Sequence, residues 1–158
     1  MLKYTRVWTD GACHGNGRED ACGGMGIYSP EAGIKMSVPW TMKSVPTNQK
    51  CELLAAIIAL REIDGDMIIY TDSDYLVRGM TEWMPGWVAR GWRKSRRGSP
   101  VKNVDYWKRL RRLVRGRDVI FRHVKGHSGV EGNEVADRLA NTGAVMHEMN
   151  HTSSMCSL

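Results

Sequence analysis

The hydrophobic pattern of the chain changes its period near residue 48, and this change limits the folds that it can adopt. Before that point, segments 3–9, 25–29 and 34–40 are rich in β-branched and aromatic residues, and residues 30–33 form a short turn between the last two. After it, apolar residues recur at helical spacing up to residue 63, and strand and helix patterns then alternate. Three strands with hairpin-type connections followed by helix–strand alternation predict an α/β domain with a mixed sheet.

The second half of the chain continues this alternation. We expect a strand at 67–70, short helices interrupted at Pro85-Gly86, a loop at 93–100, a helix at 104–114, a strand at 119–124 and a helix at 132–144. The last dozen residues show no pattern, which predicts a mobile C-terminal tail. The expected organisation is therefore one domain over residues 1–145 and a tail over 146–158.

Two of the predicted strands end in the same way. One runs through Val-Trp-Thr-Asp-Gly at 7–11 and the other through Ile-Tyr-Thr-Asp-Ser at 69–73, so each brings an aspartate to its end. If the strands are parallel neighbours, Asp10 and Asp72 emerge at the same carboxyl edge, where ligands usually bind such sheets. A single strand-terminal aspartate is more often a cap or turn residue, and the repeated context makes the pair more informative.

Two further acids lie on the buried stripes of their predicted helices. Glu52 shares its stripe with Ala56 and Ala59, and Asp137 shares its stripe with Ala140 and Ala144. Buried carboxylates are rare unless they are paired or bind a metal. Alternatively, each acid lies near a helix N-terminus and simply interacts with the helix dipole.

Four acids gathered at one edge favour a divalent cation. They would raise one another's pKa values unless cations compensate their charge. Oxygen ligands select Mg²⁺ or Mn²⁺ over zinc, and the chain has no Cys/His set with zinc-ligand spacing. Two such ions about 3.5–4 Å apart would promote in-line hydrolysis of a phosphodiester.

The charge distribution predicts a polyanionic partner. Between Arg90 and Arg122 there are 13 lysines and arginines but only Asp105 and Asp118 as acids, whereas the whole chain carries a net charge of +6. The remainder is therefore net acidic. The chain has no membrane-length apolar run, its first residues lack a long apolar signal core, and its four cysteines suggest no disulfide framework. We therefore expect a cytoplasmic protein with reduced thiols.

Five stretches, taken together, resemble the type 1 ribonuclease H family. They are TDGACHGN at 9–16, TNQKCELLAA at 47–56, YTDSDY at 70–75, VKNVDYW at 101–107 and VKGHSGVEGNEVAD at 124–137. The resemblance implies a ribonuclease H-like fold with a five-stranded mixed sheet. It also implies an enzyme that hydrolyses the RNA strand of RNA–DNA hybrids with Mg²⁺, or Mn²⁺ as a substitute, and leaves 5′-phosphate and 3′-hydroxyl ends.

The resemblance also assigns roles to particular residues. The metal-binding and catalytic acids correspond to Asp10, Glu52, Asp72 and Asp137, and the catalytic loop histidine corresponds to His127. A histidine between glycines suits proton transfer or product release. The residues expected to contact the hybrid near the acids and along a protruding basic handle are Gly11, Ala12, Cys13, Asn16, Asn48, Trp83, Trp87, Arg90, Trp92, Arg93, Lys94, Arg96 and Arg97.

The chain departs from the family pattern at three places near these residues. Residues 18–20 lengthen the loop after Asn16, Asp74 stands where an uncharged amide is common, and Pro85-Gly86 is expected to break the handle helix. Two other functions remain open at this point, a DNA-processing nuclease of the same fold and a non-catalytic hybrid-binding module. We expect a monomer without an obligate protein partner.

Overall fold

The structure is a computed structural model that describes residues 3–126 and 131–156, and it shows a five-stranded sheet within them. The strands are β1 (Thr5–His14), β2 (Cys22–Ser29), β3 (Ile34–Pro39), β4 (Met67–Thr71) and β5 (Val119–His123). Their order is β3-β2-β1-β4-β5. The pairs β1–β2 and β2–β3 are antiparallel, whereas β1–β4 and β4–β5 are parallel. The predicted mixed sheet and its strand directions are confirmed.

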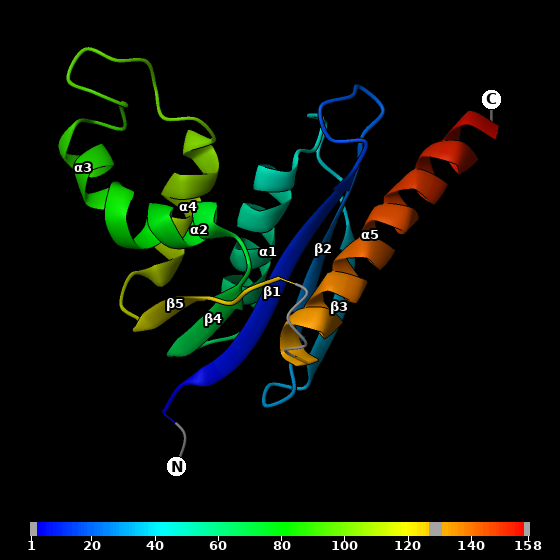
Figure 1. Cartoon of the computed structure of the whole chain (residues 1–158), viewed down its shortest axis with the longest axis horizontal. Helices are drawn as coiled ribbons and strands as arrows, with labels where there is room; N and C mark the ends of the chain where they lie inside the picture. The colour runs from blue at the N-terminus through cyan, green and yellow to red at the C-terminus, as the bar shows by residue number, and fades with distance from the viewer. Residues whose placement is uncertain (1–2, 127–130, 157–158) are drawn as a thin grey trace.

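Helices cover both faces of this sheet (Figure 1). They are α1 (Asn48–Glu62), α2 (Asp74–Arg78), the π-helical turn η1 (Gly79–Trp83), α3 (Met84–Ala89), α4 (Val104–Val114) and α5 (Glu131–Cys156). The N-terminus of α1 is capped by the Thr47 hydroxyl, which accepts a hydrogen bond from the Lys50 main-chain N–H at 3.1 Å. Among the described residues, no helix has the length and apolar character needed to span a membrane.

The two faces of the sheet are packed differently. On one face, strand residues such as Val7 and Ile69 join the apolar side of α1 and Trp107 of α4 in one large core. On the other face, α5 packs through small residues, and Ala12 of β1 meets Ala140 and Ala144. The core on the α1 face contains most of the buried apolar residues, whereas the small residues on the α5 face allow helix and strand backbones to approach closely.

Glycines in β2 let helix α5 lie almost directly on the sheet. A Cβ atom added at Gly24 would lie 2.1 Å from the Ala144 main-chain nitrogen, and one at Gly26 would lie 2.1 Å from the Ala136 carbonyl oxygen. Any side chain at either position would push the helix away. The glycines therefore set the height of α5 above the sheet, and with it the position of Asp137.

The predicted end of the first strand is wrong. Asp10 does not terminate β1, because antiparallel pairing with β2 continues from Asp10 opposite Gly26 to His14 opposite Cys22. The parallel pairing with β4, by contrast, ends at Trp8 opposite Tyr70. Asp10 thus lies just beyond the parallel ladder, at the edge where Asp72 follows β4.

The predicted break at Pro85-Gly86 is also wrong. The chain stays helical from Asp74 to Ala89, with η1 between α2 and α3. In η1 the Met84 N–H bonds to the Gly79 carbonyl, five residues earlier, and Pro85 falls in the first turn of α3. A proline is tolerated there because its missing N–H needs no partner in the first turn.

The last helix is longer than its sequence pattern predicts. Helix α5 continues past Ala144 to Cys156, through most of the predicted tail. His147 is 8% exposed, and its Nδ1 accepts a hydrogen bond from the Gly23 N–H at 2.9 Å. This contact ties the extension to β2 and corrects the predicted helix end. The division of the chain at residue 145 into a catalytic domain and a mobile tail stays a prediction.

Candidate active site

Three of the predicted acids gather at the edge where the β1–β4 parallel ladder ends. One carboxylate oxygen from each of Asp10, Glu52 and Asp72 lies within 4.8 Å of the other two. Asp10 is 3% exposed, while Glu52 and Asp72 are half-buried. Oxygen atoms at these separations can share a hard divalent cation.

Gly11 brings Glu52 to this group. A Cβ atom at Gly11 would lie 2.4 Å from the main-chain carbon of Cys51 and the main-chain nitrogen of Glu52. The absence of a side chain therefore allows the first turns of α1 to touch β1 beside Asp10. The helical face that Glu52 shares with buried alanines correctly predicted that Glu52 points toward the sheet. The role of Gly11 in the close contact between α1 and β1 is visible only in the structure.

Asp72 and Asp137 reach the same edge from the two sides of β1. Asp72 directly follows β4, and a Cβ atom at Gly126 would lie 3.0 Å from its Oδ2, so the chain after β5 passes close to this carboxylate. Asp137 lies in the second turn of α5 and is half-buried. It lies outside the group of three, yet its hydrogen bond and charge both raise the pKa of Asp10.

Burial and the charges of neighbouring acids raise the pKa values of two carboxyl groups, those of Asp10 and Glu52. Desolvation, followed by the charge of Asp72, raises the pKa of Asp10 to about 8, although a hydrogen bond from Glu52 opposes the shift. Desolvation, followed by the charges of Asp10 and Asp72, raises the pKa of Glu52 well above its usual value. The site is thus electrostatically incomplete without a cation.

The residues fit a divalent metal ion. Oε2 of Glu52 is buried and has no hydrogen-bond partner among the described residues, which is costly for a carboxylate oxygen. A cation placed among the three acids would satisfy that oxygen and relieve the repulsion that raises both pKa values. The donors are all carboxylate oxygens, the ligand type that Mg²⁺ and Mn²⁺ prefer.

Comparison with known proteins agrees with this geometry. The family model for RNase H matches residues 3–145. Ribonuclease H of Alcanivorax borkumensis is 40% identical over 158 residues, which cover 99% of this chain and 100% of that protein. The chain belongs to the ribonuclease H family.

Two solved structures are similar to the chain in fold. The crystal structure of LC9-RNase H1, a type 1 RNase H with the type 2 active-site motif, has a TM-score of 0.71 and 32% identity, and covers 93% of this chain and 75% of its own. The foamy viral protease-reverse transcriptase in complex with RNA/DNA hybrid has a TM-score of 0.72 and 25% identity over 91% of this chain and 21% of its own.

In this family member the predicted handle is a compact aromatic and basic unit. We define it as residues 83–100. Trp87 contacts Trp83, Trp92 and Trp107 at centroid distances of 5.8, 6.4 and 5.2 Å, which anchors the handle to the core residue Trp107. The following loop closes on itself, since the Lys94 N–H donates to the Ser99 carbonyl at 3.0 Å. The predicted cationic side chains lie exposed on this unit, at Arg90, Arg93, Lys94, Arg96 and Arg97.

The two predicted asparagines lie together at the start of α1, where Asn48 stands one helical turn before Glu52. Oδ1 of Asn16 accepts a hydrogen bond from the main-chain N–H of Asn48 at 3.0 Å, and both residues are exposed. Ala12 is buried and Cys13 is half-buried on the same strand as Asp10. Roles for all of these in substrate binding stay predictions. His127 lies outside the described residues.

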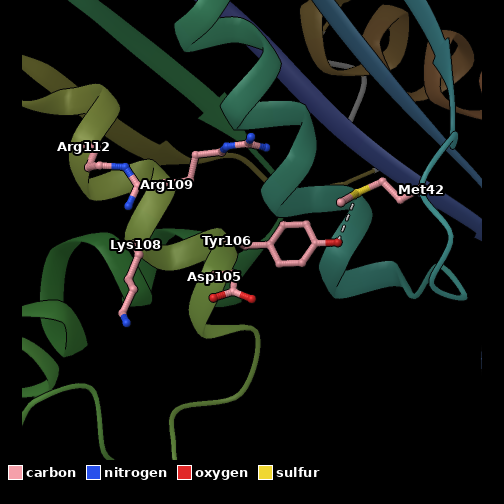
Figure 2. A pocket seen from close by; sticks show the side chains of 6 residues that line it. All are labelled: Met42, Asp105, Tyr106, Lys108, Arg109 and Arg112. Atoms are coloured by element: carbon pink, nitrogen blue, oxygen red, sulfur yellow. Dashed lines mark hydrogen bonds between the residues drawn. The ribbon is translucent and has the colours of Figure 1, made fainter.

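The pocket in Figure 2 is not the candidate site. It has a volume of about 340 Å³ and lies between Met42 and the exposed side of α4, where the Tyr106 hydroxyl donates to Met42 Sδ at 3.4 Å. Its lining residues are Met42, Asp105, Tyr106, Lys108, Arg109 and Arg112, and none of them is a predicted site residue. This pocket has no cluster of carboxylates comparable to Asp10, Glu52 and Asp72, so the candidate active site is that group.

Sequence reasoning missed one polar contact to the site. Nδ2 of Asn141 lies 2.9 Å from the main-chain oxygen of Asp137 and 3.4 Å from its Oδ1. The only sequence signal was a polar residue four positions after Asp137, at the spacing that places two helical side chains together. That signal is common on exposed helix faces, and so it was not informative by itself.

Proposed function

We infer that the chain is a ribonuclease H, an enzyme that hydrolyses the RNA strand of RNA–DNA hybrids. The observation that carries this inference is the group formed by Asp10, Glu52 and Asp72 at one sheet edge, in a chain whose family model match spans residues 3–145. The relatives' names give the activity, and the foamy viral neighbour was solved with an RNA/DNA hybrid.

The acids are suited to hold the divalent metal on which the reaction depends. We propose two Mg²⁺ ions, with Mn²⁺ as a possible substitute, held by Asp10, Glu52 and Asp72 with Asp137 as the fourth ligand. Bound there, the ions would supply charge stabilisation at the phosphate and lower the pKa of water. Because the pKa values of Asp10 and Glu52 are raised, metal binding would release protons from this group.

The bond changes follow from the products that we propose. Water attacks the phosphorus and gives up one proton as the new P–O bond forms, the bond from phosphorus to the 3′-oxygen breaks, and the departing 3′-oxygen takes up one proton. The products are a 5′-phosphate and a 3′-hydroxyl. We propose His127 as the residue that moves a proton or assists product release, since an imidazole titrates near neutral pH.

Recognition of the hybrid would combine two surfaces. The main chain of 11–13 directly follows Asp10, and Asn48, bonded to Asn16, stands one helical turn before Glu52. We propose that these groups contact the minor groove, where 2′-hydroxyls distinguish RNA from DNA. The exposed cations of the handle would bind phosphates of the DNA strand and make affinity depend on salt. Sequence preference should be weak, because backbone contacts carry little sequence information.

The setting that we propose is a monomeric enzyme of the cytoplasm whose catalytic domain spans residues 1–145, with no obligate protein partner. Cys13, Cys22 and Cys51 are free thiols, which suits a reducing compartment.

The test is cleavage of matched duplexes. End-labelled RNA–DNA, RNA–RNA and DNA–DNA duplexes of one sequence are incubated with Mg²⁺, Mn²⁺ or chelator, beside an Asp10→Asn variant. We expect cutting of only the RNA strand of the hybrid, dependent on metal and lost in the variant. Binding of the hybrid without cutting would support a non-catalytic module, and cutting of DNA would support a DNA-processing nuclease.

A further inference from the structure

A side-chain bridge connects the two elements that carry Asp10 and Asp137. Nε2 of His14, the last residue of β1, lies 2.9 Å from Oδ1 of Asn141 on α5. Asn141 in turn donates from Nδ2 to the main-chain oxygen of Asp137 at 2.9 Å and to its carboxylate Oδ1 at 3.4 Å. The contacts thus run from the end of the first strand to a carboxylate of the candidate metal site.

The chemistry of the three groups gives this bridge one direction. A carboxylate oxygen only accepts hydrogen bonds, so Asn141 must turn its NH₂ group toward Asp137. Its Oδ1 then faces His14 and can only accept, which requires a proton on Nε2 of the imidazole. Both the neutral tautomer with that proton and the imidazolium ion satisfy the contact. The bridge therefore needs no change of protonation to work.

The bridge also lies where packing does not already determine these side chains. His14 is exposed and Asn141 is half-buried, in contrast to the buried alanines Ala140 and Ala144 on the same helix. Asparagine is a poor helix former, so its place inside α5 is not explained by helix propensity. The hydrogen bonds are the specific interactions that these two side chains make.

We propose that Asn141, oriented by His14, is a positioning residue that holds the Asp137 carboxylate toward the metal site. One oxygen of Asp137 is directed by the Asn141 amide, which leaves the other oxygen for the cation. Hydrogen bonds behind a ligand carboxylate commonly restrict its orientation and strengthen metal binding. The proposal rests on the proposed function only in taking Asp137 as a metal ligand.

The test measures metal binding without substrate. Mn²⁺ is titrated into the intact protein and binding is followed calorimetrically, with folding of every variant checked by its thermal transition. The variants are Asn141→Leu, His14→Leu, His14→Gln and the double leucine variant. Asp137→Asn removes the ligand itself, and Thr142→Leu is the matched control because Thr142 is exposed at the next position of α5.

We expect the dissociation constant for Mn²⁺ to rise about tenfold in Asn141→Leu, at the lower end of losses of this kind. His14→Leu should raise it about two- to fivefold, and His14→Gln should restore most of that loss, since a glutamine amide can also donate to Asn141. The double variant should bind Mn²⁺ as Asn141→Leu does, because His14 acts through Asn141. Thr142→Leu should bind as the unaltered protein does.

Any one of three results would overturn the proposal: Asn141→Leu binds Mn²⁺ as tightly as Thr142→Leu, the losses of the single variants add in the double variant, or Asp137→Asn leaves binding unchanged. None of these depends on cleavage, so they are separate from the test of the proposed function. A protein that shows the expected series but cuts no hybrid would retain the bridge and lose the proposed activity.

Discussion

The acidic edge and the basic handle carry opposite charges and are built in opposite ways. At the edge, Asp10 is 3% exposed and the backbones of β1 and α1 come so close at Gly11 that a Cβ atom would clash. In the handle, Lys94, Arg96 and Arg97 are exposed on a loop that mainly contacts itself. The fold holds the acids together against their repulsion, whereas water solvates the cations. Substitutions at the edge should therefore change stability and activity together, and those in the handle should change mainly affinity.

The strongest test of this contrast is Gly11→Ala. The added methyl group would lie 2.4 Å from main-chain atoms of Cys51 and Glu52, so α1 must move away from β1. We expect the free energy of unfolding to fall by about 3 kcal/mol. The rate of hybrid cleavage should fall about 100-fold or more, since Glu52 would be displaced. Chemical denaturation and steady-state kinetics measure the two effects, and an unchanged rate would show that the close approach at Gly11 is not needed for catalysis.

The second test uses the pH dependence of stability in the metal-free protein. The pKa of Asp10 is raised from 3.8 to about 8 in the folded state. Between these values the folded protein keeps a proton that the unfolded chain has lost, so the free energy of unfolding should decrease as pH rises from about 4 to 8. The contribution of Asp10 should be absent below pH 4 and constant above about pH 8.

Asp10→Asn separates this residue from its neighbours. We expect the variant to be inactive, yet more stable than the unaltered protein by about 2 kcal/mol at pH 8, because one buried charge is removed. Its stability should depend less steeply on pH, with Glu52 still contributing in the same direction. Urea denaturation in chelator at pH 5 and pH 8 measures both. Equal slopes in the two proteins would contradict the raised pKa of Asp10.

The residues in these predictions were identified from the sequence, but the acidic edge and the handle were found from different signals. The acids were found because Asp10 and Asp72 share a local context and because Glu52 and Asp137 interrupt apolar stripes, all of which are visible in one dimension. The place of Asp10 inside β1 was not predicted, because the extra pairing of β1 depends on a partner strand that begins only at Cys22. Local pattern shows which residues are unusual, and strand pairing decides where they lie.

The handle and the end of α5 show where local pattern fails. Proline rules predicted a break at Pro85, but the π-helical turn η1 places that residue in a first helical turn. The extension of α5 depends in part on a long-range hydrogen bond from Gly23 to His147, and no window of sequence contains both residues. The positive charge of the handle, by contrast, could be counted directly from the sequence.

The third test removes cations from the handle. A variant with Lys94, Arg96 and Arg97 changed to alanine should bind the hybrid about tenfold more weakly at moderate salt. The slope of log affinity against log salt concentration should become shallower by about 2–3, because three phosphate contacts are lost. The free energy of unfolding should change by less than about 0.5 kcal/mol, since the side chains are exposed.

A variant with Arg109, Arg111 and Arg112 changed to alanine is the matched control. It alters the net charge equally, on exposed positions of α4 outside the handle. Fluorescence anisotropy with a labelled hybrid over a range of salt concentrations compares the two. Equal losses in both variants would indicate that total charge attracts the hybrid, and would contradict a specific role for the handle.

The smallest expected effect comes from Gly91→Ala, which completes the comparison with Gly11. Gly91 has φ +65° and no heavy atom within 4 Å of an added Cβ, so the methyl group meets only the intrinsic strain of left-handed backbone. We expect a loss of about 1 kcal/mol in unfolding free energy and little change in cleavage rate. Thermal denaturation and steady-state kinetics test this. A large loss of activity would contradict the contrast between the two regions. Because the added methyl group contacts no other atom, it could act only by shifting the loop that carries the cations, and the handle would then have to be held as rigidly as the acidic edge.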